Sequence, residues 1–307
     1  MRESLCAMGL NEIQTYSFVS PKGVDNVRIA EDSWERGFVR IINPLGEENS
    51  VMRTILTPNM LEVLGRIFRN IETVKAFEIG NTFVENILDK SALPDEQHSL
   101  CIGLYGKDED FYSLKGVIEE LFRVMGIEDA VFISESEYGV YHPGRCARIS
   151  VKSKFASEES PELYDELGIM GEIHPDVAEK YGMSGVRVYC CELMFDSIQR
   201  HADRTIVYKP LPKYPATSRD IALLVDEDME VGKIEELIKK EAGNILEHIR
   251  LFDVYRGKQV DEGKKSVAFT LTYRDKEKTL TDEDVAKVHD NVLEILREKL
   301  NAVLREM

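Results

Sequence analysis

The sequence predicts a two-domain α+β protein. Its 307 residues are too many for one ordinary domain. A stretch with three prolines, Pro210, Pro212 and Pro215, is typical of a stiff, extended connector and separates two different patterns. Residues 1–200 mix helical and strand patterns irregularly, whereas residues 207–307 alternate in a regular order. We therefore expect a larger α+β domain followed by a smaller one.

The first domain is predicted to begin with two helices separated by a strand. A short helix ends at Gly9 and is followed by the strand pattern "EIQTYSFV". Thr57 is predicted to cap a second helix, with Pro58 at its first position. Leu61 and Leu64 lie on one face of that helix, which is therefore predicted to be amphipathic.

Strands dominate the remainder of the first domain. The strand patterns are "KAFEIGNTFV", "HSLCIGLYG", "VFIS", "RCARISV", "LYDELGIMGEI" and "VRVYCCELMF". An apolar stripe from Phe111 to Phe122 predicts a helix that stops at Gly126, and Pro175 starts a short helix. Together these patterns predict a mostly antiparallel sheet with helices on one side.

The second domain is predicted to follow the order βαββαβ. The predicted elements are strands at Ile221–Val225, Ile245–Tyr255, Ser266–Arg274 and Ala302–Arg305, and helices at Val231–Glu241 and Thr281–Lys299. In the third strand Val267 and Phe269 alternate with Ala268 and Thr270, which indicates one buried and one open face. Thr281 is the predicted N-cap of the last helix. This order is that of a ferredoxin-like unit, in which two helices cover one face of the sheet.

The net charge of −17 is unevenly distributed along the chain. Residues from Val207 onward carry 18 basic and 21 acidic side chains, which leaves a charge of −14 on the preceding part. The acidic first part is a poor binder of polyanions in general. The nearly balanced last third can still present a local basic face to RNA.

Cysteine usage and hydropathy indicate a reducing, aqueous compartment. Cys190 and Cys191 are adjacent and would point to opposite faces of a strand, which suits neither a metal site nor an easy disulfide. No stretch approaches the about 20 apolar residues of a membrane span, and the N-terminus lacks a signal sequence. We therefore expect a cytoplasmic protein with no membrane partner.

Seven stretches of the sequence, kept in order, resemble one protein family. They are "GLNEIQTYSF", "NPLGEENSVMRT", "KAFEIGNTF", "KYPATSRDIALLVDED", "LFDVYRG", "GKKSVAFTLTYRD" and "TLTDEDV". Together they are similar to the C-terminal part of the beta subunits of bacterial phenylalanine–tRNA ligase (phenylalanyl-tRNA synthetase). The resemblance implies a class II synthetase-like antiparallel sheet module, catalytically inactive, over residues 1–200. It implies a ferredoxin-fold anticodon-binding domain over residues 207–307.

The resemblance also implies partners and cofactors. In the family the beta subunit pairs with a catalytic alpha subunit in an α2β2 tetramer, which attaches phenylalanine to its tRNA with ATP and Mg²⁺. The family's N-terminal domains have no counterpart in these 307 residues, so we expect one part of such a subunit. This part is expected to hold no cofactor, to scaffold the alpha subunit and to bind the anticodon region of the tRNA for phenylalanine.

Two positions indicate, from the residues themselves, that the first domain is not catalytic. Class II enzymes hold ATP phosphates with two arginines, because the planar guanidinium binds two oxygens. The slot after Phe83 holds Val84, and the slot after Glu192 holds Leu193. An aliphatic side chain cannot stabilise a transferring phosphate. Arg53 invites the hypothesis of a surviving cationic site, but a structural ion pair is the favoured interpretation.

The predicted subunit interface lies on the first strand and on the helix after Pro58. Its residues are Ile13, Tyr16, Phe18, Leu61 and Leu64. The stretch "GLNEIQTYSF" resembles the helix–strand element by which class II enzymes dimerise. An internal strand of one folded module is an equally weighted alternative.

The predicted RNA-binding residues gather near the strand ends and turns of the second domain. They are Lys213, Tyr214, Arg219, Arg250, Phe252, Tyr255, Arg256, Lys258, Lys264 and Lys265. Single-stranded RNA loops are bound by stacking on aromatic or guanidinium planes, with basic groups on the phosphates. For each residue, solvent exposure or core packing is the alternative, and Arg219 with Asp220 can form a local structural pair.

No metal site is expected. His142 and His174 each precede a proline in a turn, and the acidic run Asp108–Asp110 is interpreted as a solvated loop. Two other functions compete with the family's. A stand-alone RNA-binding or regulatory protein, built from the same modules without an alpha partner, stays open. The missing arginines count against an active class II enzyme of unusual motif.

Overall fold

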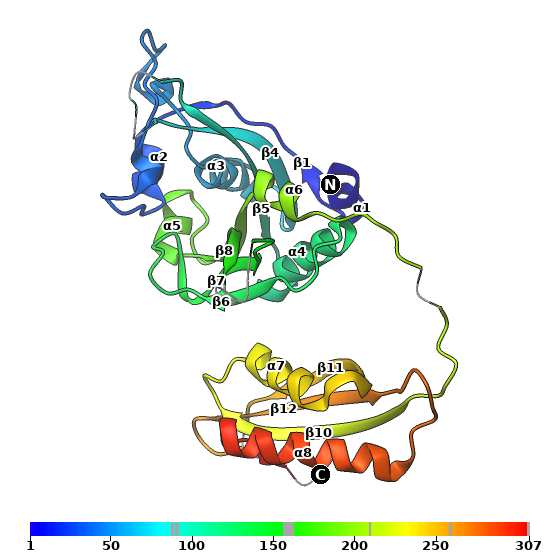
Figure 1. Cartoon of the computed structure of the whole chain (residues 1–307). Coiled ribbons are helices and arrows are strands. Elements are labelled where there is room, and N and C mark those ends of the chain that lie inside the picture. The colour runs from blue at the N-terminus through cyan, green and yellow to red at the C-terminus, as the bar shows by residue number, and fades with distance from the viewer. Residues whose placement is uncertain (87–88, 90–91, 156–162, 209, 258–259, 306–307) are drawn as a thin grey trace. The chain divides into compact units, whose positions relative to one another are not determined.

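The computed structural model describes residues 1–86, 89, 92–155, 163–208, 210–257 and 260–305, and it divides into two compact units (Figure 1). The first unit is Met1–Ile206 and the second is Val207–Met307. Two apolar clusters form the core of the first unit, and a third forms the core of the second. None of the helices in the described part of the chain combines the length and apolar character that a membrane span requires.

A seven-stranded, mostly antiparallel sheet organises the first unit, as predicted. Its strand order is β1 (Asn11–Glu12), β4 (Val74–Val84), β5 (Asp95–Tyr105), β9 (Val188–Met194), β8 (Tyr164–Ile173), β7 (Tyr141–Lys152) and β6 (Val131–Ser134). Only the β1–β4 pair is parallel among these strands. A separate pair joins β2 (Phe18–Val19) to β3 (Val51–Met52).

The predicted strand "EIQTYSFV" is wrong in its middle. Only its ends are strand, in β1 and β2, and residues 13–17 have no regular structure. The backbone N–H of Thr15 donates to the carboxylate of Glu78 at 3.1 Å instead of to a neighbouring strand. The alternating pattern therefore reflects contacts with β4 and not a continuous ladder.

Helices cover both faces of the large sheet, so the prediction of helices on one side is wrong. One face carries α1 (Arg2–Ala7), α4 (Phe111–Met125) and α6 (Phe195–His201), and the other carries α2 (Lys22–Asn26), α3 (Thr57–Phe68) and α5 (Pro175–Lys180) (Figure 1). The reason is visible in β5, where Leu100 and Ile102 enter one cluster while Cys101 and Tyr105 enter the other. A strand that is apolar on both sides must be covered on both sides.

Two helix starts depart from the local prediction. Leu56, not Thr57, is the N-cap of α3, because the Thr57 hydroxyl bonds to Glu192 of β9 at 2.6 Å. Asp110 caps α4 through a reciprocal pair of bonds with Ser113, so the last residue of the acidic run is structural. Short helices such as α2 and α6 were missed, because five to seven residues carry too little periodicity.

The second unit has the predicted βαββαβ order. Its elements are β10 (Thr217–Asp226), α7 (Val231–Ala242), β11 (Leu246–Tyr255), β12 (Lys264–Tyr273), α8 (Asp282–Leu300) and β13 (Val303–Leu304). The antiparallel sheet has the order β11-β12-β10-β13, and one cluster holds the inward side chains of both helices. Thr281 caps α8 with Asp284, which confirms the predicted N-cap.

Candidate functional site

Both predicted arginine slots are buried in the first unit. Val84 ends β4 and is 7% exposed, and Leu193 in β9 is fully buried in the cluster that α4 covers. Cys190 and Cys191 enter opposite clusters, as their adjacent positions predicted. Replacing Leu193 by a cation would place an unpaired charge in an apolar core. The geometry therefore offers no phosphate site at these positions.

The remaining cation of this region, Arg53, forms a buried ion pair. Its Nη1 lies 2.9 Å from Oε1 of Glu78, and the two side chains are only 4% and 2% exposed. Arg53 also donates from Nη1 to the Thr15 hydroxyl and from Nε to the Asn81 carbonyl. A Cβ at Gly80 would lie 2.3 Å from Nη2 of Arg53, so a larger residue there would displace the guanidinium. The structural interpretation of Arg53 is confirmed.

A second buried carboxylate, Glu192, holds the beginning of α3. Its two oxygens accept the backbone N–H groups of Leu56 and Thr57 and the Thr57 hydroxyl, at 2.6–2.9 Å. A carboxylate at a helix N-terminus satisfies donors that the helix itself cannot bond. The acid that precedes the second arginine slot therefore has a structural task.

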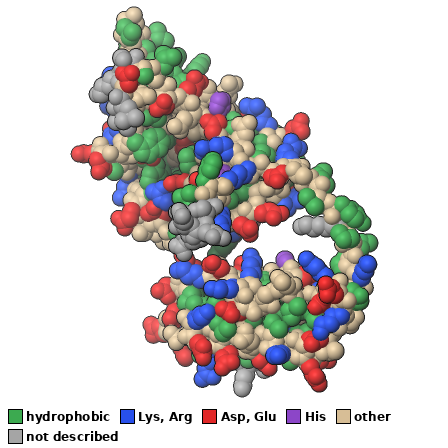
Figure 2. All heavy atoms as spheres, viewed as in Figure 1, with side chains coloured by type: hydrophobic (Ala, Val, Ile, Leu, Met, Phe, Trp, Pro, Cys, Tyr) green, Lys and Arg blue, Asp and Glu red, His purple; other side chains and the backbone are tan. Residues whose placement is uncertain are grey.

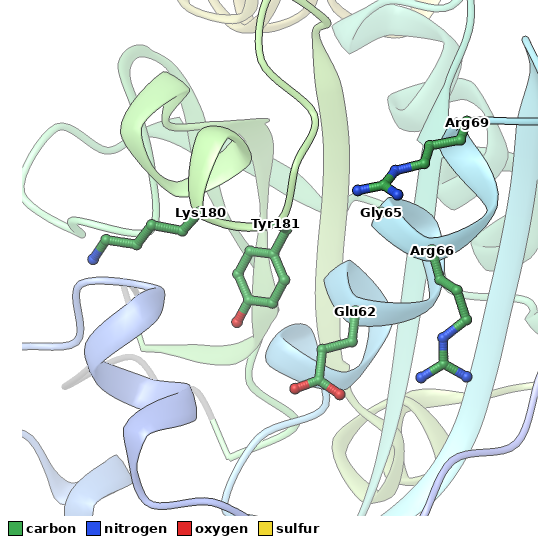
Figure 3. Close-up of a pocket in the computed structure, with 6 residues that line it drawn as sticks. All are labelled: Glu62, Gly65, Arg66, Arg69, Lys180 and Tyr181. Atoms are coloured by element: carbon green, nitrogen blue, oxygen red, sulfur yellow. The ribbon is translucent and has the colours of Figure 1, made fainter.

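A depression of about 430 Å³ lies between α3 and the end of α5 (Figure 3). Its lining residues are Glu62, Gly65, Arg66, Arg69, Lys180 and Tyr181. The cations do not converge on one point, because the Lys180 side chain points away from both arginines and donates to the carbonyl of Asp25. This surface therefore does not form an anion site.

The two histidines predicted to stand in turns bond to backbone groups near them. Nδ1 of His142 accepts the N–H of Gly144, and Nδ1 of His174 accepts the N–H of Asp176 at the start of α5. Within the described ranges no cluster of three or more His, Cys, Asp or Glu side chains has an arrangement suited to a metal ion. His142 lies in β7 and His174 is the N-cap of α5, so the prediction that both stand in turns is wrong.

The structure splits the predicted interface residues into two groups. Tyr16 is 83% exposed and Phe18 is 50% exposed, while Ile13 is half-buried against the core. Leu61 and Leu64 of α3 are fully buried in the core between this helix and the sheet, so their assignment to a surface is wrong. The apolar stripe of α3 packs on its own sheet, which periodicity alone cannot distinguish from a partner's surface.

Three predicted RNA-binding residues share the open face of the second sheet. Arg250, Tyr255 and Lys264 pair in register with residues whose side chains point away from the helices. The guanidinium of Arg305 lies 5.6 Å from the ring centre of Tyr255, over one face of the ring. Lys264 is paired with Asp226 at 2.8 Å. The open face therefore carries Arg250 and an aromatic ring that contacts Arg305.

Two other predicted contacts, Lys265 and Arg219, lie on the face of the second sheet that the helices cover. Lys265 is 6% exposed, and burial lowers the pKa of its ammonium group. Arg219 bonds to Asp282 in the first turn of α8 at 2.8 Å. The predicted RNA contact of Lys265 is therefore wrong, and Arg219 is a helix-side ion pair.

The remaining predicted RNA contacts lie at the margins of the sheet. Phe252 is half-exposed at a bulge of the edge strand β11, and Arg256 pairs with Glu227 at 3.4 Å. Lys213 is exposed, whereas Tyr214 is half-buried and its carbonyl accepts a bond from Arg274. Lys258 lies outside the described residues.

Comparison with known proteins decides the family. Residues 1–195, nearly two thirds of the chain, match the family described as the phenylalanyl tRNA synthetase beta chain CLM domain. The chain belongs to the phenylalanyl-tRNA synthetase beta chain family. Residues 212–305 match the ferredoxin-fold anticodon binding domain, which agrees with the fold of the second unit.

Curated relatives match along nearly the whole chain. The phenylalanine–tRNA ligase beta subunit of Clostridium acetobutylicum is 44% identical over 98% of this chain and 36% of its own length. That of Clostridium tetani is 42% identical over 99% and 37%, and that of Symbiobacterium thermophilum is 35% identical over 99% and 34%. The chain spans about a third of the length of these relatives.

In this synthetase-family sequence, the alternation of side chains along β12 and β10 already predicts which face of the second sheet each residue occupies. The alternation that places Val267 and Phe269 under the helices also places Lys265 there. Arg219 likewise shares its parity with Ile221, which is buried. Arg305 was missed altogether, because only the pairing of β13 with β10 brings it to the open face.

The burial of Glu192 predicts a specific pH dependence of stability. Burial raises the pKa of its carboxyl group, so the folded chain holds this proton more tightly than the unfolded chain does. The resulting stability is present below the unfolded pKa, about 4.3, and is lost as the pH rises through the folded pKa. Glu192→Gln removes this dependence. The difference in unfolding free energy between wild type and the variant should therefore shrink as the pH rises from about 4. Urea unfolding midpoints of both proteins at several pH values measure this difference. A difference that stays constant with pH would contradict a raised pKa of Glu192.

Proposed function

We propose that this chain is part of the beta subunit of a phenylalanine–tRNA ligase and acts in the cytoplasm. In this proposal the first unit scaffolds a catalytic alpha subunit within an α2β2 tetramer, and the second unit binds the anticodon region of the tRNA for phenylalanine. The observation that carries it is the joint match of both units, in order, to the family's synthetase-like and anticodon-binding domains.

The first unit does not fit ATP or Mg²⁺, which are assigned to the alpha subunit of the whole enzyme. Adenylate formation brings a carboxylate and a triphosphate together and needs fixed cations. Val84 and Leu193 are buried and neutral, and Arg53 is held by Glu78. We therefore assign no step of the reaction to this chain.

Exposed apolar side chains support a docking role for the first unit. Tyr16 and Phe18 are followed by Ile42 and Leu45, which are 94% and 98% exposed. The Phe18 strand pairs with β3, and Ile41 bonds to Ser50 just before β3, so these segments are neighbours. Apolar side chains are visible at this end of the unit (Figure 2). Such groups on a protein surface usually mark a binding site.

The purified chain is expected to show no phenylalanine-dependent exchange of pyrophosphate into ATP. The two arginine slots hold Val84 and Leu193, which cannot neutralise phosphate oxygens. The measurement is pyrophosphate exchange with and without added alpha subunit. Exchange by the chain alone, at rates above a heat-inactivated sample, would contradict a scaffold role.

Tyr255→Ala is expected to weaken binding of the anticodon stem-loop by about tenfold, because the open face loses its stacking ring. Lys239→Ala is the matched control, since Lys239 is exposed on α7, over the opposite face. Fluorescence anisotropy of a labelled stem-loop, titrated with the full chain in low salt, measures both. Equal losses for the two variants would mean that the open face is not the RNA site.

A further inference from the structure

We propose that the depression between α3 and the end of α5 binds a free α-amino acid through its ammonium and carboxylate groups (Figure 3). This site lies within the first unit and goes beyond the docking and RNA-binding roles proposed above. The volume of about 430 Å³ lies within the range of small-molecule sites. The side chains that line the depression determine which kind of small molecule fits it.

Two oxygen-bearing groups of the depression lack a partner. The Glu62 carboxylate makes no hydrogen bond or ion pair within the described residues, and the buried hydroxyl of Tyr181 has no hydrogen bond there either. The two groups are neighbours, because burial and, after it, the charge of Glu62 raise the pKa of Tyr181. Partial burial also raises the pKa of Glu62, which Arg66 opposes. An ammonium group bound here would donate to both oxygens.

Two arginines supply the opposite charge beside Glu62. Arg66 and Arg69 follow Glu62 by four and seven residues along α3 and its C-cap, so the three side chains share one side of the helix (Figure 3). Neither guanidinium makes a hydrogen bond or an ion pair within the described ranges. Glu62 and Arg66 have the spacing of an ion pair on a helix, but the structure shows no such pair. The arginines therefore offer donors to a ligand carboxylate.

A close backbone contact holds the two walls of the depression together. A Cβ at Gly65 would lie 2.1 Å from the carbonyl oxygen of Tyr181, so α3 and the end of α5 touch at this glycine. Lys180 also lines the depression, but its side chain points away and donates to the carbonyl of Asp25 at 3.2 Å. The groups that face a ligand are therefore one carboxylate, one hydroxyl and two guanidinium groups.

This charge pattern favours a ligand that carries both signs. A free anion would be repelled by the Glu62 carboxylate, and a free cation would be repelled by Arg66 and Arg69. Residues four apart on a helix have Cβ atoms about 5–6 Å apart, so one small molecule can reach Glu62 and Arg66 together. An α-amino acid has its ammonium and carboxylate groups on one carbon. It therefore matches a carboxylate and a guanidinium at this spacing.

The test measures binding of L-alanine to the full chain by saturation-transfer NMR, with ethylamine and propionate as analogues that each keep one charge. L-alanine should bind with a dissociation constant of about 1–10 mM, which suits a ligand of so few atoms. Each analogue should bind at least about tenfold more weakly, because it loses one charged hydrogen bond. Equal binding of all three molecules would contradict a site for a zwitterion.

Four variants locate the binding groups. Glu62→Gln and Arg66→Gln should each weaken L-alanine binding by about tenfold. Tyr181→Phe should weaken it by about fivefold without lowering the urea unfolding midpoint, because the lost hydroxyl has no partner among the described residues. Lys180→Gln is the matched control and should bind like wild type, because Lys180 points away. If L-alanine does not bind, or if Glu62→Gln and Lys180→Gln bind it equally, the inference is wrong.

Discussion

Arg53→Met is expected to destabilise the first unit by about 3–5 kcal/mol, as removal of one partner of a buried ion pair does. Methionine nearly fills the space of arginine but leaves the Glu78 carboxylate buried without its cation. The carbonyl of Asn81 also loses its donor. Urea unfolding measures the loss. Trp34, the only tryptophan in the sequence, reports on the first unit by fluorescence.

Two controls separate the unpaired charge from other effects of this substitution. Arg53→Met combined with Glu78→Gln leaves no buried charge, and the new amide oxygen can still accept the N–H of Thr15. The double variant should therefore be more stable than the single one. Arg123→Ala breaks an exposed pair with Glu120 and should barely move the midpoint. If the double variant is as unstable as Arg53→Met, the unpaired carboxylate is not the cause.

Gly126→Ala should cost about 2–5 kcal/mol, because it combines backbone strain with a steric clash. Gly126 ends α4 with φ +69°, and a Cβ there would lie 1.6 Å from the carbonyl oxygen of Asp203. The substitution would push Asp203 away and weaken its bond to Met125. It therefore acts on both the end of α4 and the start of the connector. Urea unfolding followed by Trp34 fluorescence measures the effect.

Gly182→Ala is the matched control for this prediction. Gly182 has φ +76°, almost the same backbone conformation, but no atom outside its chain neighbours lies within 4 Å of its Cβ position. Gly182→Ala should lower the free energy of unfolding only by the backbone strain, about 1–2 kcal/mol. Equal losses at both glycines would show that the contact with Asp203 contributes nothing.

The second unit could be predicted almost completely from the sequence. Alternation in β12 gave its buried face, and Thr281 gave the start of α8. These features are local, because period-two and period-3.6 patterns and caps depend on a few neighbouring residues. The first unit was less predictable. Its strand β5 is apolar on both faces, and such a run does not indicate which helices cover it.

What the sequence determined by itself is that no arginine stands at the two positions where class II enzymes hold ATP phosphates. Val84 and Leu193 occupy the two arginine slots in any fold, and no packing gives an aliphatic side chain a charge. Tertiary structure alone decided where the other groups point. Glu78 neutralises Arg53 from 25 residues away, Glu192 reaches α3 across the sheet, and Leu61 turns inward. Such pairings depend on strand register and on which element covers which face. Those are long-range choices that no local pattern contains.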